Sequence, residues 1–313
     1  ANVEALVLLD RCSYAYWPIS TTDGRVLDTC AQLYRIQKDG TPQLIDRSPY
    51  KLGWLDDTEG DVDMGSAATL TSFNEYGMKE IETTNYGLIL SGHGNGDQVG
   101  FDSTNDTSLN HQELGYALEQ ALGRVDEVCR PKLDLVVLAA CAMATAGIYS
   151  SLTPHAHWLI ASQENIYGYD FTWMHGLGGA DAKGTIALDE VSQALSNARI
   201  NGETGTGQQV TWALSQEKSE TLQRITSEVG AMLISENVTK RELEDASFNP
   251  RTYDLRLVTE KVQSDALLME LDALLEQAVF EQTELSDSLR DSIQGYGISV
   301  TTSDLGLPGS LLF

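Results

Sequence analysis

The sequence predicts an α/β protein whose central sheet is mostly parallel and covered by helices on both faces. Short apolar segments, each ending near a small or polar residue, recur along the chain. Segments with helical periodicity separate them, and this alternation is typical of a three-layer sandwich. The segments expected to form strands are 5–10, 31–36, 86–91, 133–139, 157–162 and 296–301.

Three stripes of apolar residues at helical spacing predict helices between these strands. The stripe residues are Leu70, Phe73 and Ile81; then Val210, Leu214, Leu222, Ile225, Val229 and Leu233; then Leu267, Leu268, Leu271, Leu274 and Leu275. From about 186 to 285 we expect a mostly helical insertion, after which the last strand returns to the sheet. We therefore expect one domain over residues 1–313, with no linker between independent units.

The charge balance excludes some classes of partner. The chain has 20 basic and 46 acidic residues and a formal net charge of −26. This charge argues against nucleic acid or an anionic membrane surface as a partner. The longest apolar segment, 133–149, is interrupted by Asp134 and is too short to span a bilayer. The spacing of the four cysteines gives no CxxC pair and does not suggest a disulfide scaffold.

A histidine and a cysteine follow two of the expected strands at the same distance. His93 lies two residues after the segment 86–91, and Cys141 lies two residues after 133–139. Functional groups of open α/β sheets gather at the carboxyl ends of strands. If these two strands are neighbours, the strand spacing of about 4.8 Å brings imidazole and thiol within reach of each other.

A thiol and an imidazole in this arrangement suit nucleophilic catalysis. The imidazole can take the thiol proton, the thiolate can attack a carbonyl carbon, and the histidine can protonate the leaving amine. The developing oxyanion needs donors, for which we expect the backbone N–H groups of Gly94 and Cys141. Small residues at 139, 140 and 142 leave room for a substrate chain. Taken alone, however, such a cysteine is usually a buried small hydrophobe.

Other motifs carry little weight. His155 and His157 have no third ligand at a telling distance, so we expect no metal site. The acidic segment 56–63 could hold calcium, but its spacing does not fit an EF-hand and favours a solvated loop. The chain has no GxxxxGK[ST] phosphate loop and no GxSxG nucleophile elbow.

Six ordered segments resemble the clostripain-like cysteine peptidases, which share the caspase–gingipain–legumain fold. The resemblance runs through ALVLLD (5–10), DVDMGSAATLTSF (61–73), YGLILSGHGNG (86–96), DLVVLAACAMATAGIY (134–149), WLIASQENIYGYDFTW (158–173) and YGISVTTSDLGLP (296–308). It implies a caspase-like domain and a cysteine endopeptidase with Cys141 as nucleophile and His93 as acid–base partner, acting as a dyad without a cofactor. Internal cleavage activates some relatives; Arg124, Arg130 and Lys132 are the basic residues between 94 and 132.

One departure from the family concerns specificity. Relatives that cut after Arg or Lys usually carry an Asp two residues before the nucleophile, where this chain has Ala139. The pocket therefore either takes a non-basic side chain or receives another acid, for which Glu164 and Asp170 are the candidates. Ser162, at the end of the preceding strand, is a further substrate-binding candidate.

Two functions from different classes follow. The first is a peptidase that acts on a protein or peptide as a monomer, without a nucleic-acid or membrane partner. The second is a catalytically weak or inactive binding or regulatory protein of the same fold, suggested by Ala139 and by the unusual opening LLDRCSYAY (8–16). The resemblance slightly favours a secreted or periplasmic location, although no signal peptide is visible in the sequence. A nucleotide-binding protein ranks last because the phosphate loop is missing.

Overall fold

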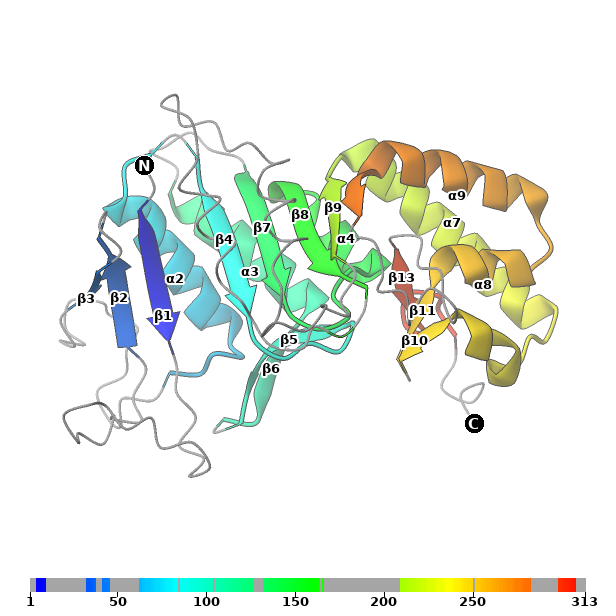
Figure 1. Cartoon of the computed structure of the whole chain (residues 1–313), viewed down its shortest axis with the longest axis horizontal. Helices are drawn as coiled ribbons and strands as arrows, with labels where there is room; N and C mark the ends of the chain where they lie inside the picture. The colour runs from blue at the N-terminus through cyan, green and yellow to red at the C-terminus, as the bar shows by residue number, and fades with distance from the viewer. Residues whose placement is uncertain are drawn as a thin grey trace.

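The computed structural model contains a five-stranded sheet at its centre (Figure 1). The residues it describes are 4–9, 32–37, 41–45, 62–83, 85–103, 105–125, 132–163, 165, 209–249, 251–282 and 298–307. The strands of the central sheet, in spatial order, are β12 (Val279–Gln282), β9 (Gln209–Ala213), β8 (Ala156–Ser162), β7 (Leu133–Ala139) and β4 (Gly87–Ser91).

The central sheet is mixed. β4 pairs with β7 and β7 pairs with β8 in parallel, as the apolar segments predicted. The β8–β9 and β9–β12 pairs are antiparallel. The expectation of a mostly parallel sheet is therefore not confirmed, because the half of the sheet beyond β8 runs in alternating directions.

The N-terminal strands form a separate small sheet. β1 (Ala5–Leu9) pairs antiparallel with β2 (Gln32–Ile36), which pairs antiparallel with β3 (Pro42–Leu44). The strands expected over 5–10 and 31–36 exist, but their prediction as parallel strands was wrong. A strand hydrogen-bonded only to antiparallel neighbours needs no crossover helix.

The strand expected over 296–301 also joins a different sheet. β13 (Ser299–Thr301) pairs antiparallel with β11 (Thr252–Asp254), which pairs with β10 (Ser247–Asn249). The prediction that this strand returns to the central sheet was therefore wrong, since β12 takes the outer position there. An isolated parallel bridge between Thr145 and Ser299 nevertheless joins β13 to the loop after β7.

Two well-capped helices follow the first sheet. α2 (Ala67–Glu80) begins at Ser66, whose side chain accepts from the N–H of Ala68, and the predicted stripe residue Leu70 is buried on it. α3 (His111–Arg124) begins with a capping box between Asn110 and Glu113. α2 packs against α3, and α3 packs against the short α4 (Ala146–Leu152).

The described part of the expected helical insertion contains both helices and strands. Its helices are α7 (Gln216–Ser235), the 3-10 helix η3 (Lys240–Ala246), α8 (Leu255–Lys261) and α9 (Asp265–Ala278). They gather beside β10, β11 and β13 at the end of the molecule opposite β1–β3 (Figure 1). The second apolar stripe is helical only from Leu222 onward, because Val210 lies in β9 and Ser215 caps α7.

Buried apolar side chains form one cluster that extends from α2 to α9 and contains no described residue of β1–β3. It includes Leu118 on α3, Val136 on β7, Leu159 on β8, Ile225 on α7 and Leu271 on α9. This continuity fits the single domain predicted from the sequence, which stays a prediction. Among the helices that the structure describes, none is long and apolar enough to cross a membrane.

Candidate active site

His93 and Cys141 follow two strands that lie side by side. The parallel register of β4 and β7 pairs Ser91 with Ala139, so each of the two residues lies two positions beyond a paired residue. The sequence-based prediction that their strands are neighbours is therefore confirmed. His93 is exposed and Cys141 is half-buried. Both lie at the carboxyl edge of the sheet, where side chains can meet a ligand.

The loops that carry these two residues touch each other at Gly94. A Cβ atom on Gly94 would lie 2.6 Å from the carbonyl oxygen of Cys141 and 2.8 Å from the Sδ atom of Met143. These distances are too short for any side chain, so a glycine is required for the loops to approach this closely. Gly94 also forms an isolated antiparallel bridge with Val99.

The chain after His93 forms a tight hydrogen-bonded turn. The Oδ1 atom of Asn95 accepts from the N–H groups of Asp97 (3.1 Å) and Gln98 (2.9 Å), an Asx turn. Gly96 has a φ of +96°, and a Cβ atom there would lie 2.3 Å from Cγ2 of Thr252. The turn leads into the hairpin of β5 (Gln98–Asp102) and β6 (Thr107–Asn110). Gly94 and Gly96 therefore serve close packing, and Gly96 also provides the backbone conformation of the turn.

The loop after β7 is buried and strained. Ala142, directly after Cys141, has a φ of +59°, which is uncommon for a residue with a side chain and costs of order 1–3 kcal/mol. The neighbouring Ala144 donates its N–H to the carbonyl of Ser162 (2.8 Å) and accepts from the N–H of Ser299 (2.9 Å). Residues from β8 and β13 thus hold the cysteine loop in its strained conformation.

Both predicted substrate-binding residues that the structure describes are buried. Ala139 is 8% exposed, and Ser162 is fully buried at the end of β8. Glu164 and Asp170 lie outside the described residues. The segments 56–61 and 126–131 lie outside them too, and with them most of the acidic segment and Arg130.

Sequence reasoning missed a buried polar cluster behind the cysteine loop. Gln163 is fully buried, and its Nε2 atom donates to Oδ2 of Asp254 (3.1 Å) and to Oγ of Ser299 (3.2 Å). Asp254 also caps α8 by accepting from the N–H of Leu257 (3.0 Å). The only sequence signal for this cluster is Asp254, which directly precedes an apolar helical segment, a position typical of an N-cap.

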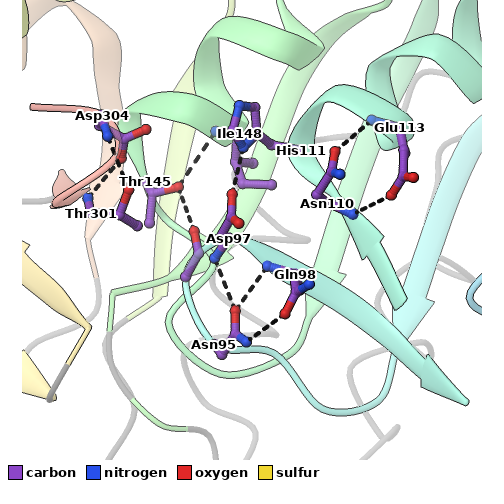
Figure 2. A network of polar contacts seen from close by, with 11 residues as sticks. Asn95, Asp97, Gln98, Asn110, His111, Glu113, Thr145, Ile148, Thr301 and Asp304 are labelled. Atoms are coloured by element: carbon purple, nitrogen blue, oxygen red, sulfur yellow. Dashed lines mark hydrogen bonds and ion pairs between the residues drawn. The ribbon is translucent and has the colours of Figure 1, made fainter. Parts of the chain in front are cut away.

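A second polar network joins the histidine turn to helices α3 and α4 (Figure 2). Nδ1 of His111 lies 2.7 Å from Oδ1 of Asp97. A Cβ atom on Gly147, in the first turn of α4, would lie 2.6 Å from Oδ1 of Asp304 and 3.4 Å from Nδ1 of His111. Thr301 donates its N–H to Oδ2 of Asp304 (2.7 Å), so this carboxylate lies between β13 and the first turn of α4.

The comparison with family models decides which family this fold and site represent. The model described as the Clostripain family matches residues 2–302. The chain belongs to the clostripain family. The family consists of C11 cysteine peptidases, which are hydrolases, so the resemblance inferred from the ordered sequence segments is confirmed. A comparison with curated proteins finds no match.

Solved structures of clostripain-family peptidases have the same caspase-like fold. A secreted C11 cysteine protease from Bacteroides thetaiotaomicron, called iotapain, has a TM-score of 0.62 at 12% identity, over 88% of this chain and 81% of that one. A secreted C11 protease from the same organism, in complex with an irreversible peptide inhibitor, has a TM-score of 0.58 at 15% identity, over 87% and 78%. An inactive zymogen C11 protease from Parabacteroides distasonis has a TM-score of 0.59 at 15% identity, over 90% and 79%.

Burial changes the pKa of Asp304 and the pKa of His155 in this clostripain-family fold. Burial raises the pKa of Asp304 above its ordinary value, against the lowering effect of the Thr301 hydrogen bonds. Burial lowers the pKa of His155, which precedes β8. His155 is half-buried and His157 is exposed. In the described ranges, no three His, Cys, Asp or Glu side chains gather as a metal site. Asp63, from the acidic segment, accepts from the N–H of Gly65 (3.0 Å) and from the hydroxyl of Thr107.

Proposed function

We propose that this clostripain-family protein is a cysteine endopeptidase in which Cys141 and His93 form the catalytic dyad. The observation that carries the proposal is the register of β4 and β7, which pairs Ser91 with Ala139 two residues before the histidine and the cysteine. The contact between the two loops at Gly94 supports it, because the loops approach each other beyond the ends of their strands.

In the proposed mechanism His93 takes the proton of the Cys141 thiol, and the thiolate attacks the carbonyl carbon of the peptide bond. The C–N bond then breaks as the imidazolium donates that proton to the leaving amine. Water, deprotonated by His93, hydrolyses the thioester and restores the thiol. His93 returns each proton that it accepts, so the cycle needs no cofactor.

The backbone N–H groups of Gly94 and Cys141 are the donors that we assign to the oxyanion. The close contact of Gly94 with the cysteine loop supports the assignment, because it brings the backbone of Gly94 beside Cys141. Removing one oxyanion donor costs about 10²–10³ in kcat in well-studied peptidases. The positive φ of Ala142 supports the assignment, since strained residues cluster at active sites.

We infer that the pocket for the residue before the scissile bond favours a non-basic side chain. Ala139 precedes Cys141 by two residues, and alternation along the strand gives both the same side of the sheet. A carboxylate at this position would contribute about 1.5–3 kcal/mol to binding a guanidinium. The full burial of Ser162 argues against its prediction as a substrate-binding residue. Glu164 and Asp170 stay the candidates for the acid that could replace the missing one. Because two similar peptidases are secreted, we also propose that this protein acts outside the cytoplasm.

Two measurements test the proposed function. Cys141→Ala and His93→Ala should each abolish cleavage of a denatured proteome by the full-length protein, with the fold retained by circular dichroism. In the wild type, Cys141 should react with iodoacetamide well below pH 8.5 and faster than the other three thiols, and His93→Ala should remove that advantage. Cleavage that survives in Cys141→Ala contradicts the proposal, and equal labelling of all four thiols favours a binding protein of the same fold.

A further inference from the structure

A backbone hydrogen bond joins the two strands directly before the proposed dyad. Gly92 donates its N–H to the carbonyl of Ala139 at 3.3 Å. His93 and Cys141 lie beyond the paired strand residues, so contacts between the two loops also set the distance between them. A change of about 1 Å in the placement of reacting groups can cost about 100-fold in rate. The residues that fix the loops against each other therefore matter for activity.

Several hydrogen bonds close the turn that follows His93. Asn95 accepts from two backbone N–H groups of the turn, and its own N–H donates to the carbonyl of Gln98 at 3.2 Å. The positive φ of Gly96 and the contact of Asp97 with His111 complete it. Hydrogen bonds of this kind restrict the backbone of the turn, so a contact made by Gly96 also restrains His93, three residues earlier.

Thr145 makes such a contact from the cysteine side. Its hydroxyl donates to the carbonyl of Gly96 at 2.9 Å and accepts from the N–H of Ile148 at 3.4 Å (Figure 2). Thr145 is 1% exposed, and its backbone is held by the N–H bond to the carbonyl of Met143 and by the bridge to Ser299. This buried hydroxyl thus joins the N-cap of α4, four residues after Cys141, to the turn that follows His93.

We infer that Thr145 is a positioning residue, whose hydroxyl sets the separation of His93 and Cys141 by holding the Gly96 carbonyl against the start of α4. The inference rests on the proposed function of the dyad. Thr145 touches neither reacting group in this assignment and acts through the two loops. Its removal should therefore lower kcat and leave KM nearly unchanged.

The test compares Thr145→Val, which keeps the shape of the side chain, with Thr145→Ser, which keeps the hydroxyl. Using the full-length protein and a fluorogenic peptide chosen from the wild-type cleavage profile, we expect kcat to fall at least about 10-fold in Thr145→Val, with KM within about twofold. Thr145→Ser should stay within about threefold of the wild type. The pH at which iodoacetamide labels Cys141 at half its maximal rate should rise in Thr145→Val, and this readout needs no turnover.

A helix-cap control separates positioning from general stability. Ser215 caps α7 by accepting from the N–H of Lys218 at 3.3 Å, away from the dyad. Ser215→Ala removes a similar helix cap and should lower the free energy of unfolding by about 1 kcal/mol. It should leave kcat and the labelling profile of Cys141 unchanged. If Ser215→Ala reproduces the loss, the inference about Thr145 is overturned. Should Thr145→Val fail to fold, Thr145→Ala takes its place, and loss of folding in both variants also overturns it.

The labelling profile also separates the failure of this inference from failure of the dyad. A wild-type profile in His93→Ala means that the dyad itself is absent, and both proposals fall. A shifted profile in His93→Ala with a wild-type profile and wild-type kcat in Thr145→Val overturns the positioning role alone.

Discussion

Gly94 lies so close to Cys141 that a methyl group on it would come within 2.6 Å of the cysteine carbonyl oxygen. A methyl group on Gly92, two residues earlier in the same segment, would have no neighbouring atom within 4 Å. The two glycines of one short segment therefore differ in the space that surrounds them, and they provide a matched pair of variants.

We expect Gly94→Ala to lower both stability and activity, because the clash is with backbone and forces the two loops apart. Overpacking of this kind typically costs about 1–3 kcal/mol of the free energy of unfolding. Chemical denaturation and peptide cleavage measure the two effects. Gly92→Ala should change the free energy of unfolding by less than about 0.5 kcal/mol. Equal behaviour of the two variants would show that the loops do not touch at Gly94.

Gln163→Leu should destabilise the protein by about 1–3 kcal/mol, because it removes a hydrogen-bond donor from the buried carboxylate of Asp254 and from Ser299. Urea denaturation measures the loss. The exposed Gln216, whose side chain donates to Glu220, provides the control: Gln216→Leu should stay within about 0.5 kcal/mol of the wild type. An unchanged midpoint in Gln163→Leu would contradict the role of this amide in the buried cluster.

Ala139→Asp should move the cleavage preference toward Arg and Lys. The new carboxylate would pair with a basic side chain in the proposed pocket, a contact worth about 1.5–3 kcal/mol, or roughly 10-fold or more in kcat/KM. Two peptides that differ only in Arg against Leu before the scissile bond measure the change. A wild-type enzyme that already prefers Arg would refute the assignment of Ala139 and direct attention to Glu164 and Asp170.

Stability should depend on pH through Asp304. Because burial raises its pKa in the folded protein, the folded state binds a proton more tightly than the unfolded state. The contribution of this proton is fully present below the ordinary value of 3.8 and is lost as the pH rises through the higher folded pKa. Asp304→Asn removes the ionisable group. As the pH rises through this window, the free energy of unfolding of the wild type should therefore fall relative to that of the variant. Denaturation curves at several pH values measure it, and a constant difference would contradict the prediction.

Sequence patterns were sufficient for the half of the sheet that carries the proposed dyad. β4, β7 and β8 are short apolar segments followed by small or polar residues, and the rule for strand ends places His93 and Cys141 at one edge. β9 was misassigned to a helix because Val210 and Leu214 are four residues apart, a spacing that also fits a helix turn. The sequence indicates this strand only through the consecutive residues Val, Thr and Trp, which are common in strands. The structure adds the complete burial of Trp212.

Contacts between distant residues could not be predicted. Thr145 bonds to a carbonyl 49 residues away, and Gln163 bonds to a carboxylate 91 residues away. Neither contact has a periodic signature, since each depends on how whole loops pack. β13 was placed in the wrong sheet for a related reason: its partner β11 is three residues long, too short to show a pattern of its own.

The bond from Ser299 to the carbonyl of Ala144 joins β13 to the cysteine loop across more than 150 residues of sequence. During synthesis on the ribosome, a nascent chain that has produced Cys141 still lacks the strand that completes its loop. The loop that contains Cys141 therefore gains this hydrogen bond only after Ser299 has been synthesised, so we expect the loop to be less restrained in a nascent chain that ends before β13.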